Sequence, residues 1–271
     1  MQRVMRLFHG DYPMALGALC LTLLLLLLTA SFVVSPESAY NYSSAQLQPP
    51  SPRHWWGTDH LGRDCFARIA MGTRSSLAIG ASSVLIGGVL GSLMGMVAAW
   101  YGGWVDLLLV RFLDALKAIP SILLALMVVA VFGSSLPVMI ATISFLAISL
   151  YARMARSSTM QVLALDYIQW ARLIGISNAR IIWRHILPNI IGPLIVTASL
   201  GFANAILTEA SLSYLGLGVR PPTPSWGRML AEAQGYIFTA PWIVIGNTLV
   251  LTLLVIGFNL LGEGLQRRLG R

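Results

Sequence analysis

Charge is scarce in this chain of 271 residues. Only 10% of the residues are Asp, Glu, Lys or Arg, whereas 56% are hydrophobic and the mean hydropathy is +0.75. Soluble domains carry charge on about a quarter of their residues. The composition therefore excludes an ordinary soluble protein. It predicts an all-α, polytopic membrane protein, because lipid offers no partners for the backbone groups of an irregular chain.

Cysteine and lysine are also rare. The two cysteines, Cys20 and Cys65, fall in an apolar run and in a polar segment, so we expect no disulfide framework. The single lysine, Lys117, follows Leu116, whereas a Walker A loop needs Gly-Lys-Ser/Thr. The chain has no Ser-His-Asp, Cys-His or zinc-ligand arrangement. We expect a non-catalytic subunit with no cofactor or metal of its own, so that any ATP and magnesium would be bound by partner subunits.

Long uncharged runs predict about six transmembrane helices. The sequence from Gly133 to Pro137 is a turn signal, which divides one overlong run into a third and a fourth span. The first run is longer than the apolar core of a signal peptide and lacks a convincing cleavage site, so we interpret it as a retained helix. The expected spans are Met14–Val34, Ser75–Trp100, a third from near Val105, a fourth ending at Ala152, Asn189–Thr208 and Ala240–Gly262.

Basic residues are distributed unevenly between the two ends of these helices. With both termini in the cytoplasm, 12 of the 18 Arg and Lys residues fall on the cytoplasmic side and 6 on the outer side. By the positive-inside rule, this predicts a multi-pass protein of the bacterial inner membrane with cytoplasmic termini. The net charge of +8 is then a signal of topology, and we expect no nucleic-acid partner because no basic, aromatic-rich soluble surface exists.

Two of the predicted spans carry distinctive patterns. In the second, Ser83, Gly87, Gly91 and Gly95 recur every four residues, which makes a smooth face for close helix packing, either within the chain or against another subunit. At the start of the third, a charge ladder of Arg111, Asp114 and Lys117 recurs every three residues, and Pro120 predicts a kink. We interpret the ladder as a salt-bridged cytoplasmic helix end. Its role would be to keep that end rigid.

Two segments are expected on the outer side. In Trp55–Leu77, we expect Thr58 or Asp59 to cap a short helix, and Arg63 and Asp64 to anchor it by hydrogen bonds. The His, Asp and Cys residues there fit no standard metal motif, so no metal site is expected. After the fifth span, Glu209 either lines a pathway or pairs across subunits, or it sits at the outer interface within reach of water; both interpretations stay open. A Gly- and Pro-rich loop with Trp226 follows.

The stretch from Asp166 to Pro188 is an island of charge and helix signals between two apolar runs. Helical spacing places Tyr167, Trp170, Ala171 and Ile174 on one stripe, with Arg172 off it. Gly175 is expected to end a first short helix, and Ser177 or Asn178 to begin a second. Pro188 is expected to mark the boundary before the next span. A structured amphipathic segment here predicts a docking site, although a plain connecting loop is the simpler alternative.

These motifs resemble the C-type permease subunit of dipeptide, oligopeptide and nickel ABC importers. The outer Gly-Thr-Asp-x-x-Gly-Arg-Asp sequence is the most specific, and the Arg-x-x-Asp signature with its Pro and the Leu-Gly-Leu-Gly loop, with Tyr214 in a Phe position, also match. The Asp166–Pro188 stretch is similar to the Glu-Ala-Ala coupling loop of these permeases. Here the triplet is Gln169-Trp170-Ala171, whereas Gly175 keeps its place.

The resemblance implies a type I ABC importer permease fold and alternating access. Its implied partners are a second permease subunit in a heterodimer, two ATP-binding subunits, an extracytoplasmic solute-binding protein and membrane lipid. The implied substrates are peptides or nickel and metal chelates. The residues implied to couple to the ATPases are Asp166, Tyr167, Gln169, Trp170, Ala171, Arg172, Gly175 and Pro188, and those implied on the outer side or pathway are Asp59, Arg63, Asp64, Glu209 and Trp226.

We divide the chain into an N-terminal helix with an outer segment at 1–74 and a core permease domain at 75–271, with the coupling loop at about 157–188. Two other functions are weighed against an ATP-driven permease. A secondary transporter or channel would need intramembrane ionisable pairs, polar rings or inverted repeats, none of which is evident. A purely structural assembly subunit would bind no ATPases.

Overall fold

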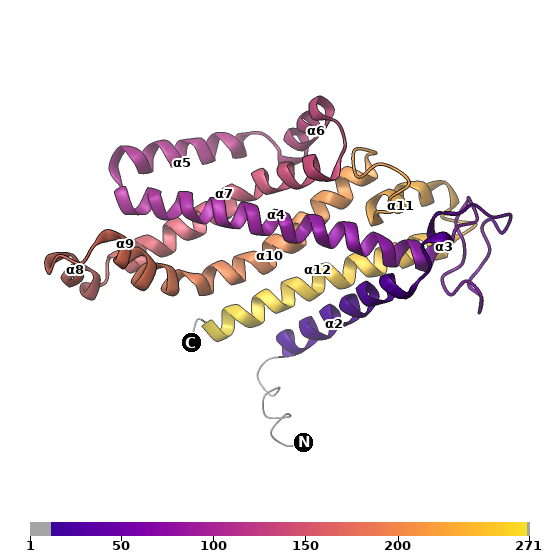
Figure 1. The fold of residues 1–271 in the computed structure, drawn as a ribbon, viewed down its shortest axis with the longest axis horizontal. Coiled ribbons are helices and arrows are strands. Elements are labelled where there is room, and N and C mark those ends of the chain that lie inside the picture. Colours follow the sequence, from indigo (N-terminus) through magenta and orange to yellow (C-terminus); the bar gives the residue numbers. More distant parts are fainter. Residues whose placement is uncertain (1–11, 270–271) are drawn as a thin grey trace, which may run out of the picture.

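The computed structural model describes residues 12–269 and is helical almost throughout that range (Figure 1). Among these residues the only β pairing is an isolated bridge between Thr58 and Asp64. Five helices are long and apolar enough to cross a membrane, and a sixth crossing is possible through a bent helix pair. The five are α2 (Tyr12–Val33), α4 (Cys65–Tyr101), α7 (Leu136–Leu163), α10 (Leu187–Tyr214) with the turns from Asn178 before it, and α12 (Pro241–Leu269). The expected all-α, polytopic architecture is confirmed.

The bundle has two ends with different structures (Figure 1). At one end lie α8 (Asp166–Leu173), α9 (Asn178–Ile181) and a π-helical turn, η1 (Ile182–Ile186); we refer to this as the α8 end. At the opposite end, the α3 end, lie α3 (Pro36–Tyr40), the segment 41–64, α11 (Trp226–Ala233) and the short η2 (Gln234–Tyr236). The start of α2 and the end of α12 point toward the α8 end (Figure 1). Both chain termini, with Arg3, Arg6 and Arg271, lie outside the described residues.

The small-residue face of α4 packs directly on the backbone of α7. A Cβ added to Gly87 would lie 2.6 Å from the carbonyl oxygen of Ser144, and one on Gly91 would lie 2.5 Å from that of Ile148. A Cβ added to Gly95 would likewise collide with the carbonyl oxygen of Ala152. The Ser83 hydroxyl donates a hydrogen bond to the carbonyl of Ile140. The four α4 positions are spaced by four residues, and the α7 residues that they face have the same spacing: Ile140, Ser144, Ile148 and Ala152. Of the two roles left open for this face, close packing within the chain is the one observed.

The helix α4 starts ten residues earlier than the predicted second span. It begins at Cys65 instead of Ser75, and the Asp64 carboxylate caps it by accepting from the Ala67 N–H at 2.8 Å. The prediction was wrong because Arg68 and Arg74 interrupt the uncharged run, although both are satisfied inside the protein. Arg68 is only 2% exposed, and Arg74 donates to Ser31 of α2. As a result, α4 crosses the predicted domain boundary at 74/75 as one continuous helix.

The third span is broken as Pro120 predicts. Helix α5 (Gly103–Ala118) ends before Ile119, which is extended, and α6 (Ser121–Phe132) leaves at 83° to it. Proline cannot donate to the preceding turn and its ring collides with it, so the chain turns there.

Pro188 behaves differently: α10 begins at Leu187, next to the predicted boundary, but the chain does not break there. Pro188 lies in the first turn of α10, and the helical path runs on from Asn178 to Tyr214. The π-helical turn η1, just before it, widens the helix by one residue. Such bulges accommodate a proline that an α-helical ladder would exclude.

Candidate functional site

The α8 segment folds as two short helical pieces joined at Gly175. Gly175 has φ +80°, a left-handed conformation that suits glycine, and the predicted helix end there is confirmed. The Ile176 N–H donates to the Ala171 carbonyl at 3.0 Å, and the Gly175 N–H donates to the Arg172 carbonyl at 3.1 Å. These two bonds form a Schellman motif, which satisfies the last carbonyls of α8. Ser177 occupies the N-cap of α9.

The buried face of α8 differs from the predicted stripe. Ile168 and Ala171 are buried against Val162, Ile181 and other apolar residues of α7 to α10. Tyr167, Trp170 and Ile174, which were expected to share a face with Ala171, point outward instead. Trp170 is 65% exposed and Ile174 is 74% exposed. The helix thus presents an uncovered apolar surface, the α8 ridge, formed by Leu165, Tyr167, Trp170, Leu173 and Ile174.

Side chains connect α8 to two of the long helices. The Tyr167 hydroxyl accepts a hydrogen bond from the Asn189 side-chain amide of α10 at 3.2 Å, and its ring lies 5.9 Å from that of His185. The Arg172 guanidinium lies 4.4 Å from the Trp100 ring of α4, a cation–π contact. Asp166 opens the helix, where a negative charge is favourable, and Gln169 is exposed. Motion of α8 would therefore be felt by α4 and α10.

At the α3 end, a network of five charged residues joins the 41–64 segment to α4 and α11. The Asp59 carboxylate accepts from Arg63 Nε at 2.7 Å and lies 3.5 Å from Arg68 Nε. Both arginines also reach one oxygen of Glu232, at 3.1 and 3.2 Å, while Arg228 binds the other at 2.9 Å. Arg68, Arg228 and Glu232 were missed from the sequence. The one sequence signal for this network was the four-residue spacing of Arg228 and Glu232, which suits an ion pair on a helix.

The outer signature residues shape the backbone. Asp59 accepts from the N–H groups of Leu61 and Arg63 at 2.8 and 3.0 Å, which closes a tight turn at Gly62, whose φ is +75°. Asp64 caps α4 and contacts His54 Nδ1 at 2.8 Å. The prediction that Thr58 or Asp59 caps a short helix was therefore wrong, because Asp64 does the capping and the capped helix is α4.

One group of possible metal ligands occurs among the described residues: Asp59, His60 and Glu232, with donor atoms within 4.8 Å of one another. The two carboxylates already bind three guanidinium groups, Arg63, Arg68 and Arg228. These positive charges repel a metal cation, and the ring of His60 stacks on Tyr236 at 5.3 Å. The arrangement is that of a structural ion network.

Trp226 and Glu209, both expected on the outer side or pathway, are fully buried within the chain. The Trp226 indole N–H donates to the Ile69 carbonyl at 3.1 Å, which fastens α11 to α4. The Glu209 carboxylate accepts from Ser76 at 3.1 Å and from Ser213 at 2.6 Å and is 0% exposed. In this chain Glu209 reaches neither water nor an open channel, so it matches neither predicted environment.

The predicted charge ladder of Arg111, Asp114 and Lys117 lies along one helix, α5, but its acidic member does not pair within the ladder. Asp114 pairs instead with Arg153 of α7 at 2.8 Å. A second pair, Asp106 with Arg156 at 2.5 Å, ties the start of α5 to α7 and was missed from the sequence. The two pairs hold α5 against α7.

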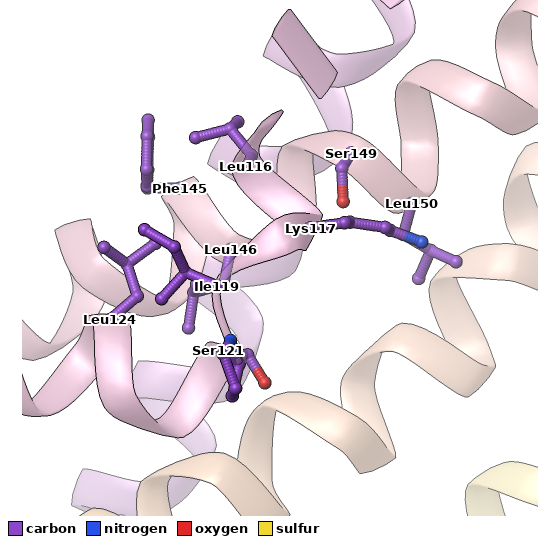
Figure 2. A pocket seen from close by; sticks show the side chains of 10 residues that line it. Leu116, Lys117, Ile119, Ser121, Leu124, Phe145, Leu146, Ser149 and Leu150 are labelled. Atoms are coloured by element: carbon purple, nitrogen blue, oxygen red, sulfur yellow. The ribbon is translucent and has the colours of Figure 1, made fainter. Parts of the chain in front are cut away.

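Lys117 lies apart from these pairs, in a cavity of about 330 Å³ at the break between α5 and α6 (Figure 2). Ser149 and Leu150, which line the same cavity, are at the middle of the 28-residue α7. Lys117 lies in the last turn of α5, at a helix end as predicted, and its side chain is exposed in this chain.

The comparisons with known proteins agree on the kind of molecule. Residues 87–271 match the family described as binding-protein-dependent transport system inner membrane component. A dipeptide transport system permease protein of Alkalihalophilus pseudofirmus is 41% identical over 90% of this chain and 80% of its own length. A glutathione transport system permease protein of Pectobacterium atrosepticum is 42% identical over 96% of this chain and 87% of its own length.

The solved structures support the same fold. The methionine ABC transporter MetNI, in an inward-facing conformation, has a chain that matches with a TM-score of 0.60 at 19% identity, over 75% of this chain and 97% of the other. An amino acid ABC transporter matches with a TM-score of 0.55 over 74% of this chain and 94% of the other. The predicted type I ABC importer permease fold is confirmed. The chain belongs to the family of inner membrane components of binding-protein-dependent transport systems.

Proposed function

We propose that this chain is one of two permease subunits that together form the pathway of a peptide importer, and that an ATP-binding subunit docks on the α8 ridge. The observation that carries the proposal is the ridge itself. It exposes large apolar side chains on a short helix at the α8 end of the bundle, where no other described part of the chain covers them. An apolar surface of this kind marks a protein–protein interface.

The energy for transport would come from the docked subunits. Since Lys117 is the only lysine and Leu116 precedes it, this chain has no Walker A loop, and ATP with its magnesium would bind to the partners. Two ATP-binding subunits, one on each permease, match the two α8 ridges of a heterodimer. We expect this chain to hydrolyse no ATP itself.

The contacts of α8 suggest how ATP binding would move the pathway. When the two ATPases close, each would displace the α8 helix docked on it. The Tyr167–Asn189 bond would pass that displacement to α10, and the Arg172–Trp100 contact would pass it to α4. Because α4 and α7 interlock through the glycine face, they would move as one body. Alternating access requires such rigid bodies with two arrangements.

The substrate would arrive at the α3 end from an extracytoplasmic solute-binding protein. The 59–64 turn and the 216–227 loop form this end. Asp59 and Arg63 are buried, so we propose that they stiffen the docking surface without touching the binding protein themselves. In this orientation the α8 end and both termini are cytoplasmic, consistent with the excess of Arg and Lys predicted on that side.

Peptides are the substrates we favour, because similar permeases at about 40% identity bear the names of dipeptide and glutathione transport systems. Nickel chelates are the second candidate. The test is copurification followed by uptake: the membrane complex should bring down two ATP-binding subunits and a second permease. A strain lacking this chain should lose uptake of a labelled dipeptide and keep uptake of nickel with a chelating amino acid. Loss of nickel uptake alone would overturn the peptide assignment, and absence of the ATPases would overturn the docking assignment.

A further inference from the structure

The cavity at the break between α5 and α6 combines one positive charge with hydroxyl groups and an apolar wall. Figure 2 shows Lys117 extending from α5 toward Ser149 and Leu150 of α7. Ser121, the first residue of α6, lines the cavity as well, and the positive end of that helix dipole adds to the charge of Lys117. The remaining wall is Leu116, Ile119, Pro120, Leu124, Phe145, Leu146 and Leu150.

The Lys117 ammonium has no ion-pair partner among residues 12–269. The carboxylate three residues before it, that of Asp114, is held by Arg153 at 2.8 Å. The other carboxylate on α5, that of Asp106, is held by Arg156 at 2.5 Å. Two arginines of α7 thus neutralise both acids of α5 and leave the lysine as an uncompensated charge.

The walls of the cavity indicate what kind of surface Lys117 faces. Ser149 and Leu150 lie in the uncharged part of α7, residues 136–152, and α7 is long and apolar enough to cross a membrane. Ionisable groups within membrane spans face a water-filled cavity or a bundle interior and mark substrate pathways. Lys117 is exposed in this chain and the neighbouring Asp114–Arg153 pair is about half exposed, so charged groups gather on this part of the α5–α7 surface.

We propose that this cavity binds the carboxylate of the transported solute during its passage. The Lys117 ammonium pairs with the carboxylate, the Ser121 and Ser149 hydroxyls donate hydrogen bonds to it, and the leucine and phenylalanine side chains take the apolar part of the solute. A broken span that offers a positive helix end to an anionic group is a recurrent way to build a site at the midplane of a membrane. The inference rests on the proposed function, because it assigns to the peptide pathway a subsite for the free C-terminal carboxylate.

The test compares two substrates in the complete complex reconstituted into liposomes with its binding protein and ATPases. One is a labelled dipeptide and the other is the same dipeptide with an amidated C-terminus. Uptake of both is measured for wild type, Lys117→Met, Lys117→Arg and the matched control Arg111→Met, which removes an exposed arginine of the same helix that does not line the cavity. The binding protein is the same throughout, so the acid-to-amide ratio of each variant relative to wild type reports the permease alone.

We expect Lys117→Met to lower uptake of the acid about tenfold or more and to leave uptake of the amide unchanged, since a hydrogen-bonded charge pair is worth about 1.5–3 kcal/mol. Lys117→Arg should restore most of the acid uptake, and Arg111→Met should keep the wild-type ratio. An unchanged ratio in Lys117→Met, or an equal loss of both substrates that arginine does not rescue, would overturn the carboxylate subsite and leave the importer assignment intact. If wild type imports neither peptide although the complex hydrolyses ATP, the peptide assignment itself fails, and this subsite fails with it.

Discussion

Asn189, in the first turn of α10, donates one hydrogen bond from its side-chain amide to the Tyr167 hydroxyl of α8 at 3.2 Å and another to the His185 carbonyl at 2.6 Å. Its amide therefore joins the short helix α8 to the long helical run Asn178–Tyr214. The other contacts between α8 and α10 are side-chain packing. This hydrogen bond is therefore the most directional link between the two helices.

Replacing Tyr167 with Phe removes the hydroxyl and keeps the ring beside His185. We expect the ATPases to remain bound and ATP hydrolysis to continue, while uptake per ATP falls about fivefold, since a hydrogen bond is worth about 1 kcal/mol. The measurement is uptake and phosphate release in the same liposomes. The control is Tyr101→Phe, which changes an exposed tyrosine at the end of α4 with no hydrogen bond among the described residues. Equal coupling ratios in both variants would contradict a transmitting role for this bond.

Trp170→Ala tests the α8 ridge as a docking surface. The indole is 65% exposed and contributes nothing to the core, so the variant should insert and fold normally. We expect the amount of copurified ATP-binding subunit to fall at least tenfold, because tryptophan is typical of the few residues that dominate an interface. Phe238→Ala removes a 97% exposed aromatic at the opposite end and should leave copurification unchanged. The docking site lies elsewhere if the two variants behave alike.

The interlock of α4 and α7 predicts opposite effects for two neighbouring glycines. A methyl group on Gly91 would sit 2.5 Å from the Ile148 carbonyl oxygen, so Gly91→Ala should destabilise the protein by about 1–3 kcal/mol. A methyl group on Gly88 would meet the Tyr151 ring at an ordinary 3.7 Å, so Gly88→Ala should be neutral or slightly stabilising. Thermal unfolding in detergent measures both. A Gly91→Ala variant as stable as wild type would contradict the observed packing.

The ion network at the α3 end predicts a large cost for removing one charge. Asp59→Asn leaves Arg63 and Arg68 with Glu232 as their remaining acidic partner. Both arginines are almost fully buried, so we expect a loss of on the order of 3 kcal/mol. Glu37→Gln changes an exposed carboxylate of α3 and should cost little. The comparison is again by thermal unfolding, and matching midpoints for the two variants would show that the network carries no stability.

Local chemistry explains which parts of the fold were predictable. Gly175 ends a helix because its conformation disfavours other residues, and Pro120 breaks one because its ring excludes the next turn; both effects act within a few residues. The glycine face of α4 was equally predictable from the sequence, but the helix that packs against it, α7, was not. The position of α7 against it depends on the whole bundle.

The errors have the opposite cause. Arg68 was read as marking a polar outer segment, yet Glu232, 164 residues away, satisfies it inside the fold. Glu209 was expected to face a pathway, a partner subunit or water, but it is buried and accepts a hydrogen bond from Ser76 of α4. In each case the deciding partner is distant in sequence.

The central claim is that ATP bound by partner subunits drives import through α8. The measurement that tests it most directly is uptake of a labelled dipeptide by liposomes that contain both permeases, both ATPases and the binding protein, with and without ATP. It is made for wild type and for a variant with Ala171→Trp and Gly175→Trp, which distort α8. The account predicts accumulation that needs ATP and is abolished in the variant while the spans stay folded. Uptake that proceeds without ATP, or that is normal in the variant, would contradict it.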